Sequence, residues 1–123
     1  MPRHLFVPLL AGLAVLPACS LRPTYQVRVV NDSNATVVAV VRRDRTLAED
    51  ETLAQARIKP GRTEVLGPVT ADPLDPVDLL VARPEDLQSL PDAHRLSRGS
   101  WTATITDAPI TTWHRFDVEL KRD

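Results

Sequence analysis

The chain has one cysteine, four glycines and three histidines in 123 residues, and each scarcity excludes a class of site. One cysteine forms no disulfide within the chain. The glycines stand at positions 12, 61, 67 and 99. They cannot complete a GxGxxG dinucleotide fingerprint, a phosphate-binding loop or a GxSxG nucleophile elbow. The sequence therefore predicts no enzyme and no cofactor.

The few histidines and the acidic residues do not indicate a metal site either. His94 and His114 lie twenty residues apart without metal-ligand spacing. His114 is expected at the boundary of a core, and His94 in a polar surface loop. Asp72, Asp75 and Asp78 recur every third residue, but prolines intervene and the calcium-loop spacing is missing. We predict turn chemistry there and no bound metal.

A strong charge of one sign is also lacking. The chain has 15 basic and 16 acidic residues, so no basic field attracts nucleic acid. We predict no nucleic-acid partner.

The first nineteen residues have the layout of an export signal. Arg3 is followed by an uncharged apolar run over residues 5–16, and Pro17 and Ala18 lead to Cys19. The run is shorter than the about 20 apolar residues that span a bilayer. It fits the apolar region of a secretory signal, which is roughly 7–15 residues long.

Leu16 at −3, Ala18 at −1 and Cys19 at +1 resemble the lipobox of bacterial lipoprotein signal peptides. Pro17 at −2 departs from the small or hydroxyl residue usual there. The resemblance implies a diacylglycerol group on the Cys19 sulfur, cleavage before Cys19 and acylation of the new amino terminus. Ser20 at +2 implies sorting to an outer membrane, facing the periplasm, in a host that has one.

Two other interpretations remain open: an ordinary secretory signal cut near Ala18, and an uncleaved N-terminal anchor. The lipobox interpretation explains a lone cysteine in an exported chain. It divides the chain into a signal peptide over 1–18, a lipidated tether over 19–23 and one domain over 24–123.

The domain consists of short β patterns. Apolar and polar residues alternate over 24–30, 100–106 and 113–121, which predicts half-buried strands. Residues 36–41 are apolar at nearly every position, which predicts a strand covered on both faces. The polar turn residues Asn31-Asp32-Ser33-Asn34 predict a hairpin between 24–30 and 36–41. Further strands are expected over 63–69, with a bulge or end at Gly67-Pro68, and over 77–83, followed by one helical turn from Pro84.

Residues 46–58 are ambiguous. Thr46-Leu47-Ala48-Glu49 fits a helical capping box. The apolar positions after it form no continuous helical stripe, however, so we favour a loop to about residue 51 and a strand over 52–58. A tight turn at Pro60-Gly61 would follow.

Six or seven strands at this spacing predict an all-β fold: a small antiparallel β-sandwich of immunoglobulin-like size. Tyr25, Trp101 and Phe116 are the expected large core residues. Asn31 and Asn34 each begin a glycosylation acceptor pattern, which we interpret as turn chemistry.

The predicted function is that of a membrane-anchored bacterial envelope lipoprotein whose non-catalytic sandwich binds another envelope protein or supports an assembly. The membrane is contacted through lipid on Cys19, and possible interface residues are Trp113, Arg42, Arg43 and Arg45. One alternative is a small-ligand or glycan-binding module with Trp113 or Trp101 as an aromatic platform. A less favoured one is a hydrolytic enzyme whose Asp and His residues converge only in the fold.

Overall fold

The computed structural model describes residues 22–45, 48–87, 93–109 and 115–123 and confirms the all-β fold. This part of the chain forms eight strands and one short 3₁₀ turn, η1 (Pro84–Asp86). The strands are β1 (Thr24–Asn31), β2 (Val37–Arg43), β3 (Glu51–Ile58), β4 (Thr63–Thr70), β5 (Val77–Ala82), β6 (Ala93–Leu96), β7 (Gly99–Asp107) and β8 (Phe116–Arg122).

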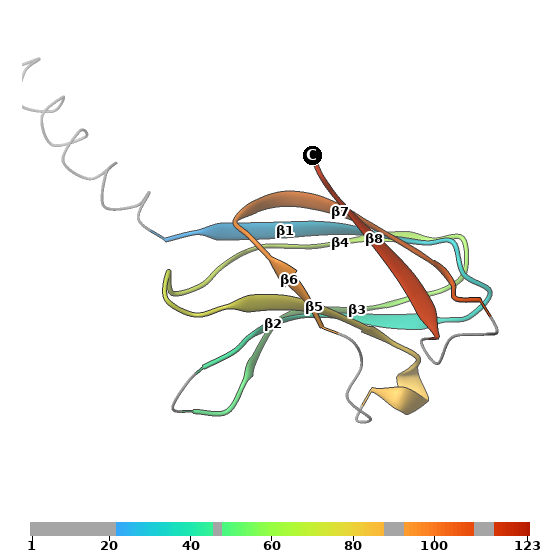
Figure 1. The fold of residues 1–123 in the computed structure, drawn as a ribbon, viewed down its shortest axis with the longest axis horizontal. Coiled ribbons are helices and arrows are strands. Elements are labelled where there is room, and N and C mark those ends of the chain that lie inside the picture. The colour runs from blue at the N-terminus through green and yellow to red at the C-terminus, as the bar shows by residue number, and fades with distance from the viewer. Residues whose placement is uncertain (1–21, 46–47, 88–92, 110–114) are drawn as a thin grey trace, which may run out of the picture.

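The strands form two four-stranded sheets that pack face to face (Figure 1). One sheet has the order β4-β1-β7-β8 and the other β3-β2-β5-β6. All pairs are antiparallel except β1 with β7, which run parallel with Tyr25 opposite Gly99. The predicted small β-sandwich is therefore confirmed, with β6 as a strand that the sequence did not indicate.

The predicted hairpin between the first two strands is wrong. β1 pairs with β4 and β7, whereas β2 pairs with β3 and β5 in the other sheet. The cause lies in the polar loop between them, where the side-chain nitrogen of Asn31 (Nδ2) donates to the carbonyl oxygens of Ala35 (2.8 Å) and Ile58 (2.9 Å). The Asp32 amide also donates to the Ile105 oxygen at 2.8 Å. The bond to Ile58 joins the loop to β3 of the other sheet, whereas the Asp32 bond continues the pairing with β7 of the first sheet.

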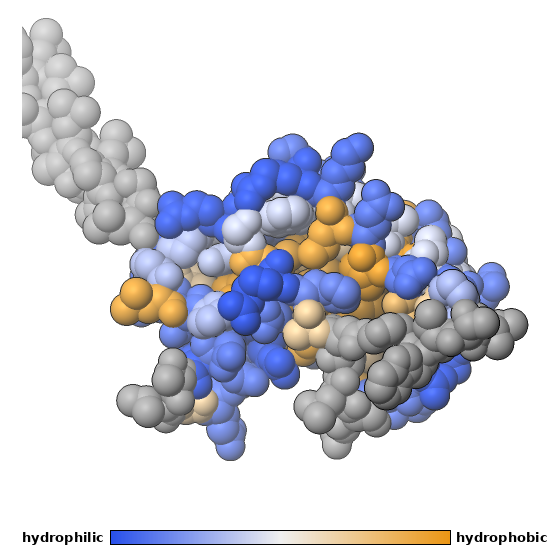
Figure 2. Space-filling view, in the orientation of Figure 1, coloured by the Kyte–Doolittle hydropathy of each residue, from blue (hydrophilic) through white to orange (hydrophobic). Residues whose placement is uncertain are grey.

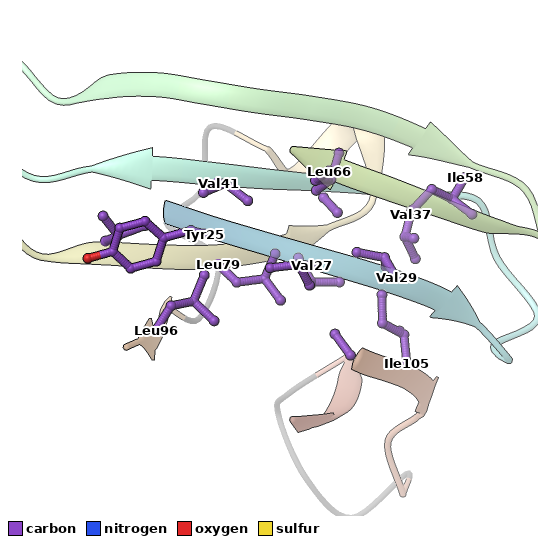
Figure 3. Packing of buried hydrophobic residues seen from close by; sticks show 14 of the residues in the cluster. Tyr25, Val27, Val29, Val37, Val41, Ile58, Leu66, Leu79, Leu96 and Ile105 are labelled. Carbon is purple, nitrogen blue, oxygen red and sulfur yellow. The ribbon is translucent and has the colours of Figure 1, made fainter. Parts of the chain in front are cut away.

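The core fills the space between the sheets. Alternate residues of β1, among them Tyr25, Val27 and Val29, meet Val37, Val41 and Leu79 from the other sheet (Figure 3). Tyr25 is buried as predicted, while Trp101 and Phe116 are only partly buried against this core.

β2 is buried on both faces, as its continuous apolar run predicts. Its outward residues Val38 and Val40 join Leu80 of β5 in a second buried cluster, against which Leu87 packs. This cluster lies outside the sandwich core, so Leu87, the residue after η1, helps to cover the outer face of this sheet.

The ambiguous segment forms strand β3 from Glu51, which confirms the loop-plus-strand interpretation for its described residues. The turn at Pro60-Gly61 is also confirmed, with Gly61 at φ +76° and the Arg62 amide bonded to the Lys59 oxygen (3.1 Å). At Gly67-Pro68 the register between β4 and β1 shifts, as a bulge requires.

The sandwich has two ends. The Ala71 amide donates to the Pro23 oxygen (3.3 Å), so the β4–β5 connection lies beside the start of β1. The Asp44 amide donates to the Pro76 oxygen (2.9 Å), which places the β2–β3 connection at the same end of the sandwich (Figure 1). We call this the proximal end; it comprises residues 22–23, 44–45, 48–50, 71–76 and 97–98. The opposite, distal end comprises residues 32–36, 59–62, 83–87, 108–109 and 115.

Within the four described ranges, no helix has the length and apolar character needed to cross a membrane.

Candidate functional site

The predicted site residues fall into two groups. Cys19 and Trp113 lie outside the described residues, as does His114. Arg42, Arg43 and Arg45 lie at or just beyond the end of β2, where they contribute to the proximal end.

The three arginines are brought together with carboxylates of their own chain. Arg43 Nη2 lies 2.7 Å from Glu51 Oε2, and its Nε lies 3.5 Å from Asp75 Oδ2. These two pairs tie the end of β2 to β3 and to the β4–β5 connection. Arg43 therefore joins β2, β3 and the β4–β5 connection through its two ion pairs.

The neighbouring arginines close the β2–β3 connection. Arg45 Nε donates to the Glu49 carbonyl oxygen at 2.9 Å, and its Nη1 lies 3.7 Å from Glu51 Oε2. Arg42 Nε lies 3.5 Å from Asp50 Oδ2. Because these side chains are 31–43% exposed, each pair contributes little by itself. Their role in an interface stays a prediction.

Two carboxyl groups also meet in this connection. The hydrogen bond that joins Asp44 to Asp50, together with the negative charge of Asp50, raises the pKa of the Asp44 carboxyl above its usual value. Asp44 is fully exposed, and Arg42 partly offsets the effect. The proximal end therefore carries side chains of both signs, and each of the three arginines lies within 4 Å of a carboxylate.

The three regularly spaced aspartates serve three separate purposes. Asp72 Oδ1 accepts from the Leu74 amide (3.0 Å), Asp75 pairs with Arg43, and the buried Asp78 accepts from Arg95 Nε (2.7 Å). No group of three or more His, Cys, Asp or Glu residues with metal-binding geometry occurs in the part of the chain that the structure describes.

His94 lies on β6, so the prediction of a surface loop there is wrong. It pairs with Leu79, whose side chain is in the core, and is itself half-buried at the edge of the sheet. The reason is that Ala93–Leu96 extends the sheet beyond β5, although its sequence is too short and polar to show strand alternation. Among the described ion pairs, none joins a carboxylate to His94.

Both the ring and the indole nitrogen of Trp101 make contacts within the domain. The Arg122 guanidinium carbon lies 4.6 Å from the centre of its ring, and its indole nitrogen donates to the Ser97 carbonyl oxygen at 2.9 Å. Arg122 also donates to the Arg98 oxygen at 2.9 Å and contacts the Ser97 hydroxyl. These contacts fix the β6–β7 turn and cover one face of the ring.

The polar loop at the distal end is built around Asn31, which has no exposed surface. Its side-chain oxygen accepts from the Ser33 amide (3.0 Å) and hydroxyl (2.6 Å). A buried amide with these partners is a structural group, as the turn interpretation of this segment predicts. Asn34 is exposed, and its backbone amide donates to Asp107 Oδ2 at 3.0 Å.

Sequence reasoning did not single out one surface residue. Leu74, in the β4–β5 connection, is 90% exposed. The other exposed large apolar residue of the described chain, Val65, is 50% exposed. The signal was available in the sequence, where a leucine stands between two Asp–Pro pairs. No family model matches the chain, and no curated protein matches it.

Proposed function

We propose that this chain is a lipid-anchored protein of the bacterial cell envelope that binds another envelope protein through its sandwich and performs no catalysis. The lipid is carried by Cys19, in the outer membrane, and the domain faces the periplasm. The observation that carries the proposal is the spacing of four residues between Cys19 and the first residue of β1 at Thr24.

This spacing supports a fixed orientation. Thr24 is five residues beyond Cys19, and a fully extended chain covers at most about 18 Å over that separation, so an anchored Cys19 holds the proximal end close to the membrane. Sandwich strands of seven to nine residues, such as β1 and β7, then lift the distal end about 25 Å further away. The distal end is thus the surface that a periplasmic protein reaches most freely.

The distal end is also suited to recognition because its backbone is held in place. The buried Asn31 fixes the loop over residues 32–36, and the Gly61 amide donates to the Asn31 carbonyl oxygen at 2.8 Å. Around this frame Asp32, Asn34 and Arg62 are exposed. Preorganised polar groups lose little conformational entropy when a partner binds.

We do not extend the proposal to glycan binding. Arg122 lies over one face of the Trp101 ring and the residue packs against the core, so little of the ring is left for a sugar. Trp113, the other aromatic residue considered for this role, lies outside the described residues.

Site-specific photo-crosslinking in intact native cells tests the proposal. A photoreactive residue is placed at Asn34 of the distal end and, as the matched control, at the exposed Glu49 of the proximal end. A C-terminal tag and mass spectrometry then identify the adducts. We expect one dominant envelope protein joined through position 34 and not through position 49. Adducts with that protein through position 49 alone would contradict the orientation, and no reproducible protein adduct from either position would contradict partner binding.

A further inference from the structure

Leu74 is held outward by an ordered turn. Its amide donates to Asp72 Oδ1 (3.0 Å), and the Asp75 amide donates to the Asp72 carbonyl oxygen (3.1 Å). Pro73 and Pro76 fix backbone angles on either side. The 90% exposure of the leucine therefore belongs to a defined conformation of the loop.

The turn is fastened to the point where the chain enters the domain. Ala71, which begins the connection, donates its amide hydrogen to the Pro23 oxygen, and Thr70 pairs with Thr24. On the other side, Asp75 forms its ion pair with Arg43 (3.5 Å). The β4–β5 connection, which carries the exposed Leu74, therefore lies at the same end of the sandwich as the start of β1 (Figure 1).

Elsewhere on the visible face, polar side chains cover most of the surface, and apolar ones gather mainly along the band between the two sheets (Figure 2). Among the described residues, the other exposed large apolar side chain is Val65, which is 50% exposed in the middle of β4. It lies five residues from the end of β4 at Thr70, which corresponds to about 17 Å along the strand. Only Leu74 of these two is placed within reach of a surface that the tether would approach.

We propose that Leu74 inserts into the interfacial layer of the lipid bilayer, so that the β4–β5 connection forms a second, reversible membrane contact beside the acyl chains. This inference rests on the proposed anchoring through Cys19. A leucine side chain gains free energy on leaving water for the apolar side of a bilayer interface. A tether of at most about 18 Å keeps the connection close enough for that contact.

The charges at the proximal end determine which lipids are needed. Arg43 is paired with Glu51 and Asp75, and Asp72 beside the leucine is exposed. Both charged residues of the β4–β5 connection, Asp72 and Asp75, are acidic, so the turn that carries Leu74 does not itself select anionic head groups. Insertion is expected on an uncharged phosphatidylcholine surface and requires no anionic lipid.

Spin labelling of the acylated protein, which begins at Cys19, tests this inference. Acylation would block Cys19, the only native cysteine, so Leu74→Cys introduces a unique thiol for a nitroxide. Val65→Cys is the matched control on an exposed apolar position away from the proximal end. Both proteins are reconstituted into phosphatidylcholine vesicles, and flotation and mass spectrometry of the amino-terminal peptide establish whether the anchor is present. Circular dichroism checks that both variants are folded.

We expect the label at position 74 to lose its accessibility to an aqueous nickel chelate and to gain accessibility to oxygen on vesicles, while the label at 65 remains aqueous. If the protein floats with an acylated Cys19 but both labels remain aqueous, or both are protected alike, the Leu74 inference is overturned and the anchoring stands. If the protein does not float and Cys19 carries a free thiol, the anchoring itself fails, and the inference fails with it.

Discussion

Replacement of Asn31 by alanine should destabilise the sandwich by about 2–4 kcal/mol. The substitution deprives the Ile58 carbonyl oxygen of a donor and the Ser33 amide of an acceptor, in surroundings where Asn31 has no exposed surface. A buried polar group left without a partner costs about 1–3 kcal/mol. The Ala35 oxygen and the Ser33 hydroxyl retain each other at 3.0 Å, so they add little to the loss.

The effect should be large against the total stability, which is roughly 5–15 kcal/mol for a domain of this size. It corresponds to a fall in Tm of about 10–25 °C. Urea and thermal unfolding, followed by circular dichroism on a chain that begins at Cys19→Ser, would measure it. Asn34→Ala is the matched control, because that residue is exposed and alanine keeps its backbone bond to Asp107. If Asn31→Ala lowered the stability as little as Asn34→Ala does, Asn31 would not be the group that fixes the loop between β1 and β2.

Two further substitutions test local features of the fold. Gly67→Ala should lower the free energy of unfolding by about 3 kcal/mol or more, because φ is +103° and the new Cβ would lie 2.7 Å from the Tyr25 carbonyl oxygen. Gly61→Ala should lower it less, because φ is +76° and no atom lies within 4 Å of the new Cβ. Equal urea midpoints for the two variants would contradict the close approach of β4 to β1. Asp44→Asn tests the interaction between Asp44 and Asp50. Because the pKa of Asp44 is raised in the folded state, the protonated carboxyl stabilises the fold below the unfolded value of 3.8, and this stabilisation is lost as the pH rises through the folded pKa. The asparagine variant should therefore gain stability relative to the parent between about pH 3 and neutral pH, and a pH-independent difference in urea midpoints would show that the two carboxyls do not interact.

Individual strands could be predicted well from the sequence because side-chain alternation is a local signal. β1 and β8 bury alternate residues, and their pattern is visible without knowledge of any partner. β6 was missed since Ala93–Leu96 has four residues, two of them charged or titratable. Only its pairing with β5 makes it a strand.

Pairing could not be predicted in the same way. The polar residues after β1 indicate a change of direction, but they do not say which sheet the chain joins next. That choice depends on Asn31 reaching Ile58, and on the parallel pairing that sets Tyr25 against Gly99. Both contacts join residues far apart in the chain.

The ion pairs at the proximal end could not be predicted from the sequence either. The arginines at the end of β2 were conspicuous in the sequence as a basic run. Their partners Glu51 and Asp75 belong to two other segments, so the sequence did not indicate that Arg43 would be used within the fold. Leu74 became a candidate only when its exposure and its place beside the start of β1 were known together.

We propose that lipid on Cys19 anchors this domain to the membrane. Mass spectrometry of the amino-terminal peptide, taken from protein purified from native membranes, determines whether Cys19 is acylated. We expect a peptide that begins at Cys19, with a diacylglyceryl thioether on its sulfur and an acylated amino group. A peptide that begins elsewhere, or one that begins at Cys19 with a free thiol, would contradict it.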